Sequence, residues 1–242
     1  MPRATARSRP APAGGTEAGT APHREAAGEG ARPRDSRPAA SGRAACRSPG
    51  AIVAFVILAA GGLAADLLSK QYAFEALLQT PAAEAQVRAV LAHYGPMPPD
   101  EVLHRLDVGR EWVAGVRLTP STNPGVVFGR PMPRLAVLAA TIVAVGLVLW
   151  FFLTAPARAW AIHVALALVL AGALGNLYDR LLGAVRVPGA GAIRHQVRDF
   201  VDCSDLYYPW VFNIADVLLV VGVAILAVCW LSGMRAEAKR SS

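Results

Sequence analysis

The chain has 242 residues, 54% of which are hydrophobic, and its formal net charge is +7. A mean hydropathy of +0.39 is too high for an ordinary soluble domain of this length, so composition excludes that class and indicates a membrane protein. The charge is unevenly distributed, because residues 1–50 hold nine arginines and four acidic residues.

The N-terminal segment, residues 1–50, is also rich in Ala, Pro and Gly. It cannot bury enough apolar surface to offset its chain entropy, so we predict that it is disordered. It contains no apolar stretch of the kind found at the centre of a signal peptide. A basic tail can bind nucleic acid, but an apolar run begins at Ala51, which favours a cytoplasmic tail beside a membrane span. We therefore expect no nucleic-acid partner.

Four apolar segments are long enough to cross a bilayer, at about residues 51–68, 135–153, 160–178 and 210–231. None shows the alternating pattern of outer-membrane barrel strands. Backbone groups in lipid must be hydrogen-bonded within their own segment, so all four are predicted to be helices. The predicted fold class is an all-α membrane protein with four transmembrane helices and a small extracytoplasmic β segment with loops.

The orientation follows from the positive charges, because cytoplasmic loops carry an excess of Lys and Arg. The Arg-rich N-terminus, Arg158 in the second-to-third connection and the C-terminal "MRAEAKR" are all placed in the cytoplasm. The chain then divides into a cytoplasmic tail (1–50), a four-helix membrane domain (51–232) and a cytoplasmic C-terminal tail (233–242).

Two longer connections are predicted to lie outside the membrane, at residues 71–134 and about 179–209. In the first, "PAAEAQVRAVLAHYG" is predicted to form a short helix. The segment "EWVAGVRLTPSTNPGVVFG" is predicted to form a strand or hairpin, because apolar residues precede a Pro/Asn/Gly turn. A pair of strands alone is marginally stable, so we expect this unit to pack on the membrane surface or on the helices.

Polar residues gather at the outer ends of the spans and in the adjacent loop. They are Asp66, Lys70, Asn176, Asp179, Arg180, Asp199, Asn213 and Asp216. Asp66 and Lys70 are four residues apart, a spacing that allows an ion pair on one helix face. Asp216 is the most unusual, since it lies about 9 Å along the fourth span from Trp210. An Asp at the bilayer centre costs about 2.5–3.5 kcal/mol, so we expect it to have a task or a partner.

Two neighbouring carboxylates can perform peptide hydrolysis. Like charges a few ångströms apart cannot both ionise, so the pair holds one proton. One Asp then acts as general base on a water and the other as general acid on the carbonyl oxygen. Asp199 is the favoured partner for Asp216, and Asp202, Asp205 and Asp179 remain alternatives. We expect no metal and no cofactor, because no His/Cys/Asp set has metal-ligand spacing.

These residues lie in sequence blocks that resemble those of lipoprotein signal peptidase (signal peptidase II), a family of bacterial membrane aspartic peptidases. The blocks are "DLLSK", "NPGVVFG", "GALGNLYDR", "VRDF" and "FNIAD". They contain Asp66, Lys70, Asn123, Gly125, Phe128, Asn176, Asp179, Arg180, Asp199, Asn213 and Asp216. The resemblance covers about residues 51–232. The segments between Lys70 and Asn123 and between Arg180 and Asp199 are longer than is usual in the family.

The resemblance implies an activity and a role for each residue. The substrate would be a prolipoprotein whose lipobox cysteine carries a diacylglyceryl group, cleaved on the N-terminal side of that cysteine. Asp199 and Asp216 would be catalytic. Substrate binding or support of the dyad would fall to Asn123, Gly125, Asn176, Arg180 and Asn213, and a structural role to Asp66, Lys70 and Asp179. We expect a monomer in contact with membrane lipid, in the bacterial inner membrane, with its active site at the outer leaflet edge.

Two other functions are compatible with intramembrane carboxylates. A proton-coupled transporter would place ionisable groups along a path to the midplane and beyond, whereas here the inner half of each span has almost none. A non-enzymatic membrane assembly factor would use the Asp residues as contacts between helices. Cleavage of a diacylglyceryl-modified prolipoprotein distinguishes the peptidase from both.

Overall fold

The computed structural model describes residues 44–127, 130–206 and 208–241. These residues belong to one of two units into which the chain divides, the unit Ala40–Ser242. Most of the segment predicted to be disordered, residues 1–43, lies outside the described residues, as does Phe128.

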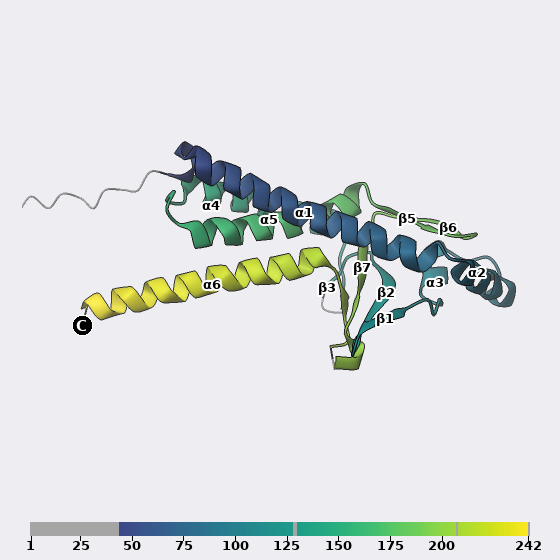
Figure 1. Ribbon diagram of the computed structural model, residues 1–242. Helices are drawn as coiled ribbons and strands as arrows, with labels where there is room; N and C mark the ends of the chain where they lie inside the picture. The colour runs from purple at the N-terminus through teal and green to yellow at the C-terminus, as the bar shows by residue number, and fades with distance from the viewer. Residues whose placement is uncertain (1–43, 128–129, 207, 242) are drawn as a thin grey trace, which may run out of the picture. The chain divides into compact units, whose positions relative to one another are not determined.

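Four long helices form the membrane part of the molecule (Figure 1). They are α1 (Pro49–Leu78), α4 (Arg134–Thr154), α5 (Trp160–Leu181) and α6 (Ile214–Ser241). Each contains a stretch that is long and apolar enough to cross a bilayer. The predicted fold class is therefore confirmed. The helix α1 begins sharply because the Ser48 side chain accepts a hydrogen bond from the Ala51 N–H, with Pro49 at the first helical position.

Two predicted span boundaries differ from the structure. The first helix continues ten residues beyond Leu68, because Ala73, Phe74 and Leu78 are buried in a second core outside the membrane part. The fourth helix begins at Ile214 and not at residue 210, because Val211 and Phe212 form a strand that pairs with Val201 and Asp202. Asp216 therefore lies in the first turn of α6, and the predicted depth of 9 Å along a helix from Trp210 is wrong.

The helices α5 and α6 pack closely through small residues. An added Cβ on Gly172 would collide with the Ala215 carbonyl of α6, and one on Gly222 would lie 2.8 Å from the Ala165 carbonyl of α5. Glycine at such positions lets two helix backbones approach, which is the common way that helices associate in lipid. On the other side of α5, the ring of Phe152 in α4 stacks on that of Phe55 in α1, with centroids 3.8 Å apart.

A four-stranded antiparallel sheet lies at one end of these helices (Figure 1). Its strands, in spatial order, are β1 (Arg110–Val113), β2 (Val116–Asn123), β7 (Val197–Asp202) and β8 (Val211–Phe212). The predicted hairpin is confirmed as β1–β2. The segment around Asp199 was expected to be loop, but it is strand β7, with Asp199 opposite Ser121 of β2.

The two unusually long connections form a second core together. The first contains α2 (Pro81–Tyr94), confirming the predicted short helix, and α3 (Pro99–Leu103), while the second contains the hairpin β5 (Ala184–Val187) and β6 (Gly191–Arg194). Their buried residues pack with the C-terminal end of α1 and with β7 in one cluster: Ala73, Phe74, Leu78, Val87, Val102, Leu103, Val185, Val187, Ile193, Phe200 and Val201. The remaining short elements are β3 (Val126–Val127), β4 (Arg130–Pro131), η1 (Ala45–Arg47) and η2 (Ser204–Leu206).

Candidate active site

Asp216 is held at the start of α6 by a reciprocal pair of hydrogen bonds. The Asn213 Oδ1 accepts from the Asp216 N–H at 3.1 Å, and the Asn213 N–H donates to Asp216 Oδ2 at 3.2 Å. This is a capping box, in which an N-cap side chain and the acidic residue three positions later satisfy each other's backbone donors. The N-terminal end of a helix also favours a negative charge. The Asp216 carboxylate is therefore fixed in position and in a favourable field.

Asp199 lies next to this cap, on strand β7. The Asn213 side chain donates from Nδ2 to Asp199 Oδ1 at 2.6 Å, and this contact is buried. One residue, Asn213, thus binds both aspartates. Burial is the main cause that raises the pKa of Asp199, to about 7, and the nearby charge of Asp216 is the second. The structure therefore brings together two carboxyl groups, one of which is protonated below about pH 7.

Asn176 of α5 connects this pair to the helices. Its Nδ2 donates to Asp216 Oδ1 at 2.9 Å, and its Oδ1 accepts from Asn213 Nδ2 at 3.2 Å and from Lys70 Nζ at 3.0 Å. The side-chain amide is satisfied on both ends, so its orientation is determined by its partners. Asn176 therefore aligns α5, α6 and α1 around the aspartates.

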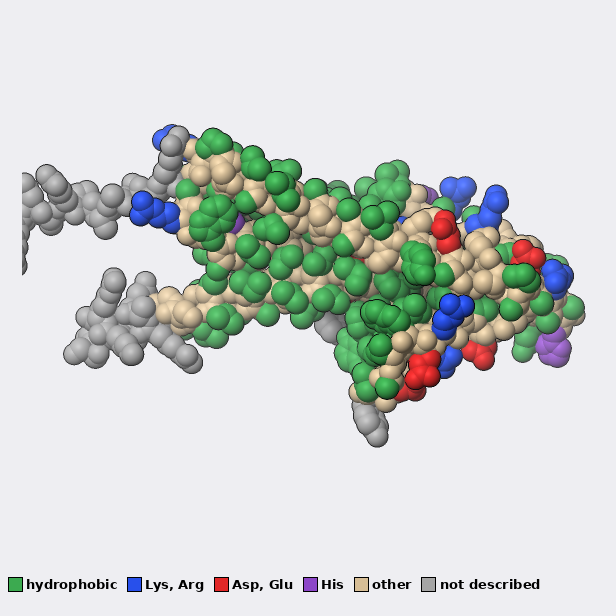
Figure 2. Space-filling model, viewed as in Figure 1, with side chains coloured by type: hydrophobic (Ala, Val, Ile, Leu, Met, Phe, Trp, Pro, Cys, Tyr) green, Lys and Arg blue, Asp and Glu red, His purple; other side chains and the backbone are tan. Residues whose placement is uncertain are grey.

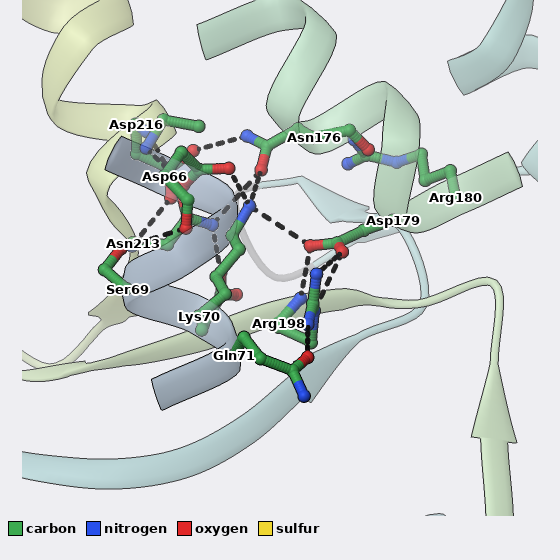
Figure 3. Close-up of polar contacts among 12 residues, drawn as sticks. Asp66, Ser69, Lys70, Gln71, Asn176, Asp179, Arg180, Arg198, Asn213 and Asp216 are labelled. Atoms are coloured by element: carbon green, nitrogen blue, oxygen red, sulfur yellow. Dashed lines mark hydrogen bonds and ion pairs between the residues drawn. The ribbon is translucent and has the colours of Figure 1, made fainter. Parts of the chain in front are cut away.

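Lys70 is the centre of a fully buried charge network behind the aspartates (Figure 3). Its ammonium contacts Asp66 Oδ2 at 2.7 Å and Asp179 Oδ2 at 3.1 Å. The Arg198 guanidinium binds Asp179 Oδ1 through Nε and Nη2 at 2.8 and 2.7 Å. Each buried charge has a partner of opposite sign, which is the condition for burying charges without a severe penalty. The spacing-based prediction of an Asp66–Lys70 pair is confirmed.

Asp66 also holds the start of α6. Its Oδ1 accepts the Ala215 N–H at 2.8 Å, while Gly175 leaves room for this carboxylate between α1 and α5. The first N–H groups of a helix have no acceptor within the helix. The Asp66 carboxylate supplies an acceptor for the buried Ala215 N–H, which would otherwise have none. The network therefore positions the turn that carries Asp216.

Arg180 interacts with the charges of Asp199 and Asp216, but the structure shows no hydrogen bond from the described Arg180 side chain to either carboxylate. Its Nη1 donates to the Asn176 carbonyl at 3.1 Å, and its charge acts on both Asp199 and Asp216. Its Nε is buried and has no hydrogen-bond partner within the described part of the chain. The guanidinium of Arg180 therefore holds a buried donor that the described residues leave without a partner.

Asn123 and Gly125 form a turn at the end of β2. Asn123 Oδ1 accepts the Gly125 N–H at 2.8 Å, and Gly125 has a φ of +119°, which favours glycine. Asn123 lies opposite Val197 in the sheet, and Val197 is two residues before Asp199 on β7. The turn is therefore near the start of the strand that carries Asp199.

The alternative loop aspartates lie further along. Asp202 is at the end of β7, where its Oδ1 accepts from Ser204 and its Oδ2 from Thr119. Partial burial acts to raise its pKa, but these hydrogen bonds outweigh it and lower the pKa. Asp205 is exposed in η2. The third alternative, Asp179, is occupied by Lys70 and Arg198. Of the four candidates, Asp199 is the one that shares the Asn213 side chain with Asp216.

An apolar groove of about 440 Å³ opens beside Asp216. Its other lining residues come from α6 and from the segment between β7 and β8: Val217, Val220, Val221, Cys203, Leu206, Tyr208 and Phe212. In Figure 2, hydrophobic side chains cover the part of the sheet region that borders α6, and acidic and basic side chains lie on the part facing away from the helices. A carboxylate at the end of an apolar groove suits a substrate that is largely apolar.

Sequence reasoning missed Arg198 and the groove residues of the 203–212 segment. The sequence shows that Arg198 directly precedes Asp199, but it does not show that Arg198 is buried. That burial depends on the contact with Asp179, which is 19 residues away. Within the described residues, no group of three or more His, Cys, Asp or Glu side chains is arranged to hold a metal ion.

Comparison with known proteins identifies the family. The family model described as "Signal peptidase (SPase) II" matches residues 58–232, which is most of the chain. This chain belongs to the signal peptidase II family. The predicted family is thereby confirmed, and the chain is a membrane peptidase.

Curated relatives agree with this assignment. The chain is 37% identical over 124 residues to a lipoprotein signal peptidase of Desulfitobacterium hafniense (strain DSM 10664 / DCB-2), covering 50% of this chain and 73% of that protein. It is also 37% identical over 118 residues to a lipoprotein signal peptidase of Caulobacter vibrioides, covering 46% and 61%. A bacterial membrane enzyme solved at 2.3 Å by the in meso method aligns with a TM-score of 0.52 at 22% identity, over 76% of this chain and 90% of that one. The last similarity supports the fold.

Proposed function

We propose that this peptidase removes the signal peptide from diacylglyceryl-modified prolipoproteins, cutting on the N-terminal side of the lipidated cysteine. We propose further that it is an aspartic peptidase whose dyad is Asp199 and Asp216. The observation that carries this assignment is the bridge made by Asn213, which binds Asp199 through its side chain and Asp216 through its backbone and side chain.

The two carboxyl groups receive different roles from their surroundings. Asp216 accepts two hydrogen bonds at a helix N-terminus, an arrangement that suits an ionised base. Asp199, with its pKa raised to about 7, supplies the proton. A water between them loses a proton to Asp216 and attacks the scissile carbonyl carbon, while the Asp199 proton passes to the carbonyl oxygen.

The resulting gem-diol collapses by the reverse transfers. The C–N bond breaks as Asp216 gives its proton to the cysteine nitrogen, and a diol hydroxyl returns a proton to Asp199. Both carboxyl groups end in their starting states, so the cycle is balanced. Arg180 and Asn123 are proposed to hold substrate backbone, Arg180 because its charge acts on both aspartates and its Nε has no partner among the described residues.

The apolar groove is proposed to receive the membrane-embedded part of the substrate. It starts at Asp216 and continues along the outer half of α6 past Val217, Val220 and Val221. The exposed apolar side chains Trp112, Leu206 and Trp210 of the sheet region are suited to rest on the outer membrane surface. We propose that the dyad lies at the outer leaflet edge with both termini in the cytoplasm, and that the protein acts as a monomer.

The rival functions fit the arrangement less well. A transporter needs a relay that continues through the span, but Asp179 lies in the last turn of α5 and Asp216 in the first turn of α6. An assembly factor needs no pair of carboxyl groups that shares a proton. Neither rival function explains why an apolar groove lies beside Asp216.

Single substitutions measured on one diacylglyceryl prolipoprotein test the dyad. Asp216→Asn and Asp199→Asn should each slow cleavage by roughly 10²- to 10⁴-fold, because each removes a proton-transfer group while conserving volume. Asp202→Asn is the matched control and should cleave at close to the wild-type rate, with thermal unfolding in detergent confirming that all variants fold. An inactive Asp202 variant beside an active Asp199 variant would reassign the second catalytic residue.

A further inference from the structure

A second groove lies outside the membrane part, between α1 and the β5–β6 hairpin. Two adjoining cavities of about 500 and 340 Å³ form it, and both are lined by Gln79 and Arg186. On the α1 side, Gln71, Glu75 and Gln79 follow one another at intervals of four residues and so form one polar stripe along the helix. The larger cavity is also lined by Phe74, Leu78, Ala184, Val185 and Arg198.

The opposite wall is a sheet edge. The His195 N–H donates to the Gly183 carbonyl, and backbone hydrogen bonds between antiparallel strands involve alternate residues. Ala184 and Arg186 therefore direct their N–H and C=O groups away from β6. In agreement, the Arg186 carbonyl accepts from Gln79 Nε2, across the groove, at 3.5 Å. An edge of this kind can pair with an extended peptide.

The groove has the length and chemistry for a few residues of extended peptide. From Gln71 to Gln79, α1 rises about 12 Å, which matches roughly four residues of a strand. Its charges are of both signs, Glu75 against Arg186 and Arg198, and its amides both donate and accept. Such a lining suits the neutral, alternating donors and acceptors of a peptide backbone better than an anionic lipid headgroup.

The groove is also within reach of the dyad. Four successive contacts of 2.9, 3.0, 3.1 and 2.8 Å lead from Asp216 through Asn176, Lys70 and Asp179 to Arg198, which lines the groove. These contacts run through the buried network, so they only limit the separation of the groove from the dyad to the length of roughly five extended residues; a spacer that passes around the network is longer. The groove lies outward of Asp66 along α1, on the side where the mature part of a cleaved precursor would leave the membrane.

We infer that this groove binds, by strand addition to β5, a short extended segment of the substrate roughly five to ten residues after the lipidated cysteine. The inference rests on the proposed function. It gives a role to the two long connections, whose residues supply β5 and the end of α1 that faces it. The groove would strengthen substrate binding and would leave the chemical step unchanged.

Two substrates with the same signal peptide and diacylglyceryl cysteine separate this inference from the proposed function. One ends at the residue after the cysteine, and the other continues for about twelve uncharged residues, enough for the spacer and the groove. The wild-type enzyme should show a lower KM for the long substrate with the same kcat, because the added contacts form equally in the ground and transition states.

Variants of the groove should remove this difference. Arg186→Pro deletes the edge N–H and the guanidinium while leaving the β6 pairing intact, and Gln79→Ala deletes one polar group of the α1 stripe. Each should raise KM for the long substrate roughly two- to tenfold, the range for one or two hydrogen bonds, and leave the short substrate unaffected. Arg194→Pro makes the same change on the opposite edge of the hairpin and should have no effect on KM.

The outcomes are distinct. Equal KM values for the two substrates with the wild-type enzyme, or unchanged KM for the long substrate in both groove variants, would overturn the inference. If Arg186→Pro also slows cleavage of the short substrate, the substitution has distorted the hairpin. In that case the KM of Gln79→Ala for the long substrate decides whether the groove binds the substrate. Failure of the wild-type enzyme to cleave even the short substrate would contradict the proposed function instead.

Discussion

Asp199 and Asp216 have different hydrogen-bond partners, and this difference gives the proposed dyad a pH dependence. Asp216 accepts from Asn176 Nδ2 and from the Asn213 backbone, whereas Asp199 accepts from the Asn213 side chain and is buried among β7 and the helix ends. Burial, followed by the charge of Asp216, raises the pKa of Asp199 to about 7. The proton that the proposed mechanism needs is thus held at Asp199 under neutral and mildly acidic conditions.

The value of kcat/KM should therefore fall as pH rises above about 7. The raised pKa means that Asp199 is protonated below this pH and ionised above it, and the ionised form has no proton to give to the carbonyl oxygen. We expect a loss of up to about tenfold per pH unit above 7, measured by cleavage rates between pH 5 and 9 with substrate well below KM. A rate that rises through pH 7 would assign the base, and not the acid, to Asp199.

At the same scale, the sequence predicts local pairs well and distant ones poorly. The Asp66–Lys70 pair follows from a spacing of four on one helix. The second bond of Asp66, to the Ala215 N–H, joins residues 149 positions apart, and no local pattern encodes it. The burial of Arg198 is equally hard to predict. A charged residue in a strand is expected to be exposed, and its ion pair with Asp179 is not visible in the local sequence.

Among the structural elements, the cores of the four spans are predictable and their ends are not. An apolar run fixes where a helix can cross lipid. The C-terminal end of α1 carries Gln71 and Glu75, so the sequence predicts a loop there, but the neighbouring Phe74 and Leu78 are buried in one cluster with Val185 and Phe200 from later in the chain. The start of α6 is likewise set by the pairing of β8 with β7, which precedes the Asn213 cap.

The close packing of α5 and α6 is the element-level feature most sensitive to substitution. The proposed dyad depends on it, because Asn176 on α5 binds Asp216 on α6. A Cβ on Gly222 would lie 2.8 Å from the Ala165 carbonyl and 3.1 Å from the Val169 nitrogen, both of which are backbone atoms that cannot rotate away. Widening this contact would separate the two helices.

Gly222→Val should therefore destabilise the protein by about 1–3 kcal/mol and lower cleavage of prolipoprotein. Gly233→Val is the matched control, because it makes the same change on the same helix where nothing lies within 4 Å of an added Cβ. Thermal unfolding in detergent micelles and cleavage rates measure the two effects. Equal unfolding temperatures for the two variants would show that α5 and α6 do not pack through this glycine.

At the scale of the whole molecule, the described part of the chain has two cores with the proposed dyad between them. One lies among the membrane helices and contains Phe55, Phe152 and Leu166. The other lies outside and is built from the two long connections, α1 and β7. Strand β7 joins them, because Asp199 binds Asn213 of the helix cap while the next residue, Phe200, is buried in the outer core. The outer core is thus positioned to support the strand that carries Asp199.

Leu103→Ala tests this support. Leu103 of α3 is 2% exposed in the outer core, so its truncation should cost about 2–5 kcal/mol of stability and loosen the packing around Phe200 and Val201. Because β7 would then hold Asp199 less firmly, kcat should fall for the short and the long substrate alike, unlike the effect of the groove variants on KM. Leu182→Ala, at a position that is 71% exposed, is the control and should change neither quantity. A destabilised Leu103→Ala enzyme with wild-type kcat below its unfolding temperature would mean that the outer core folds independently of the dyad, and that β7 is positioned by the Asn213 and Asp179 contacts alone.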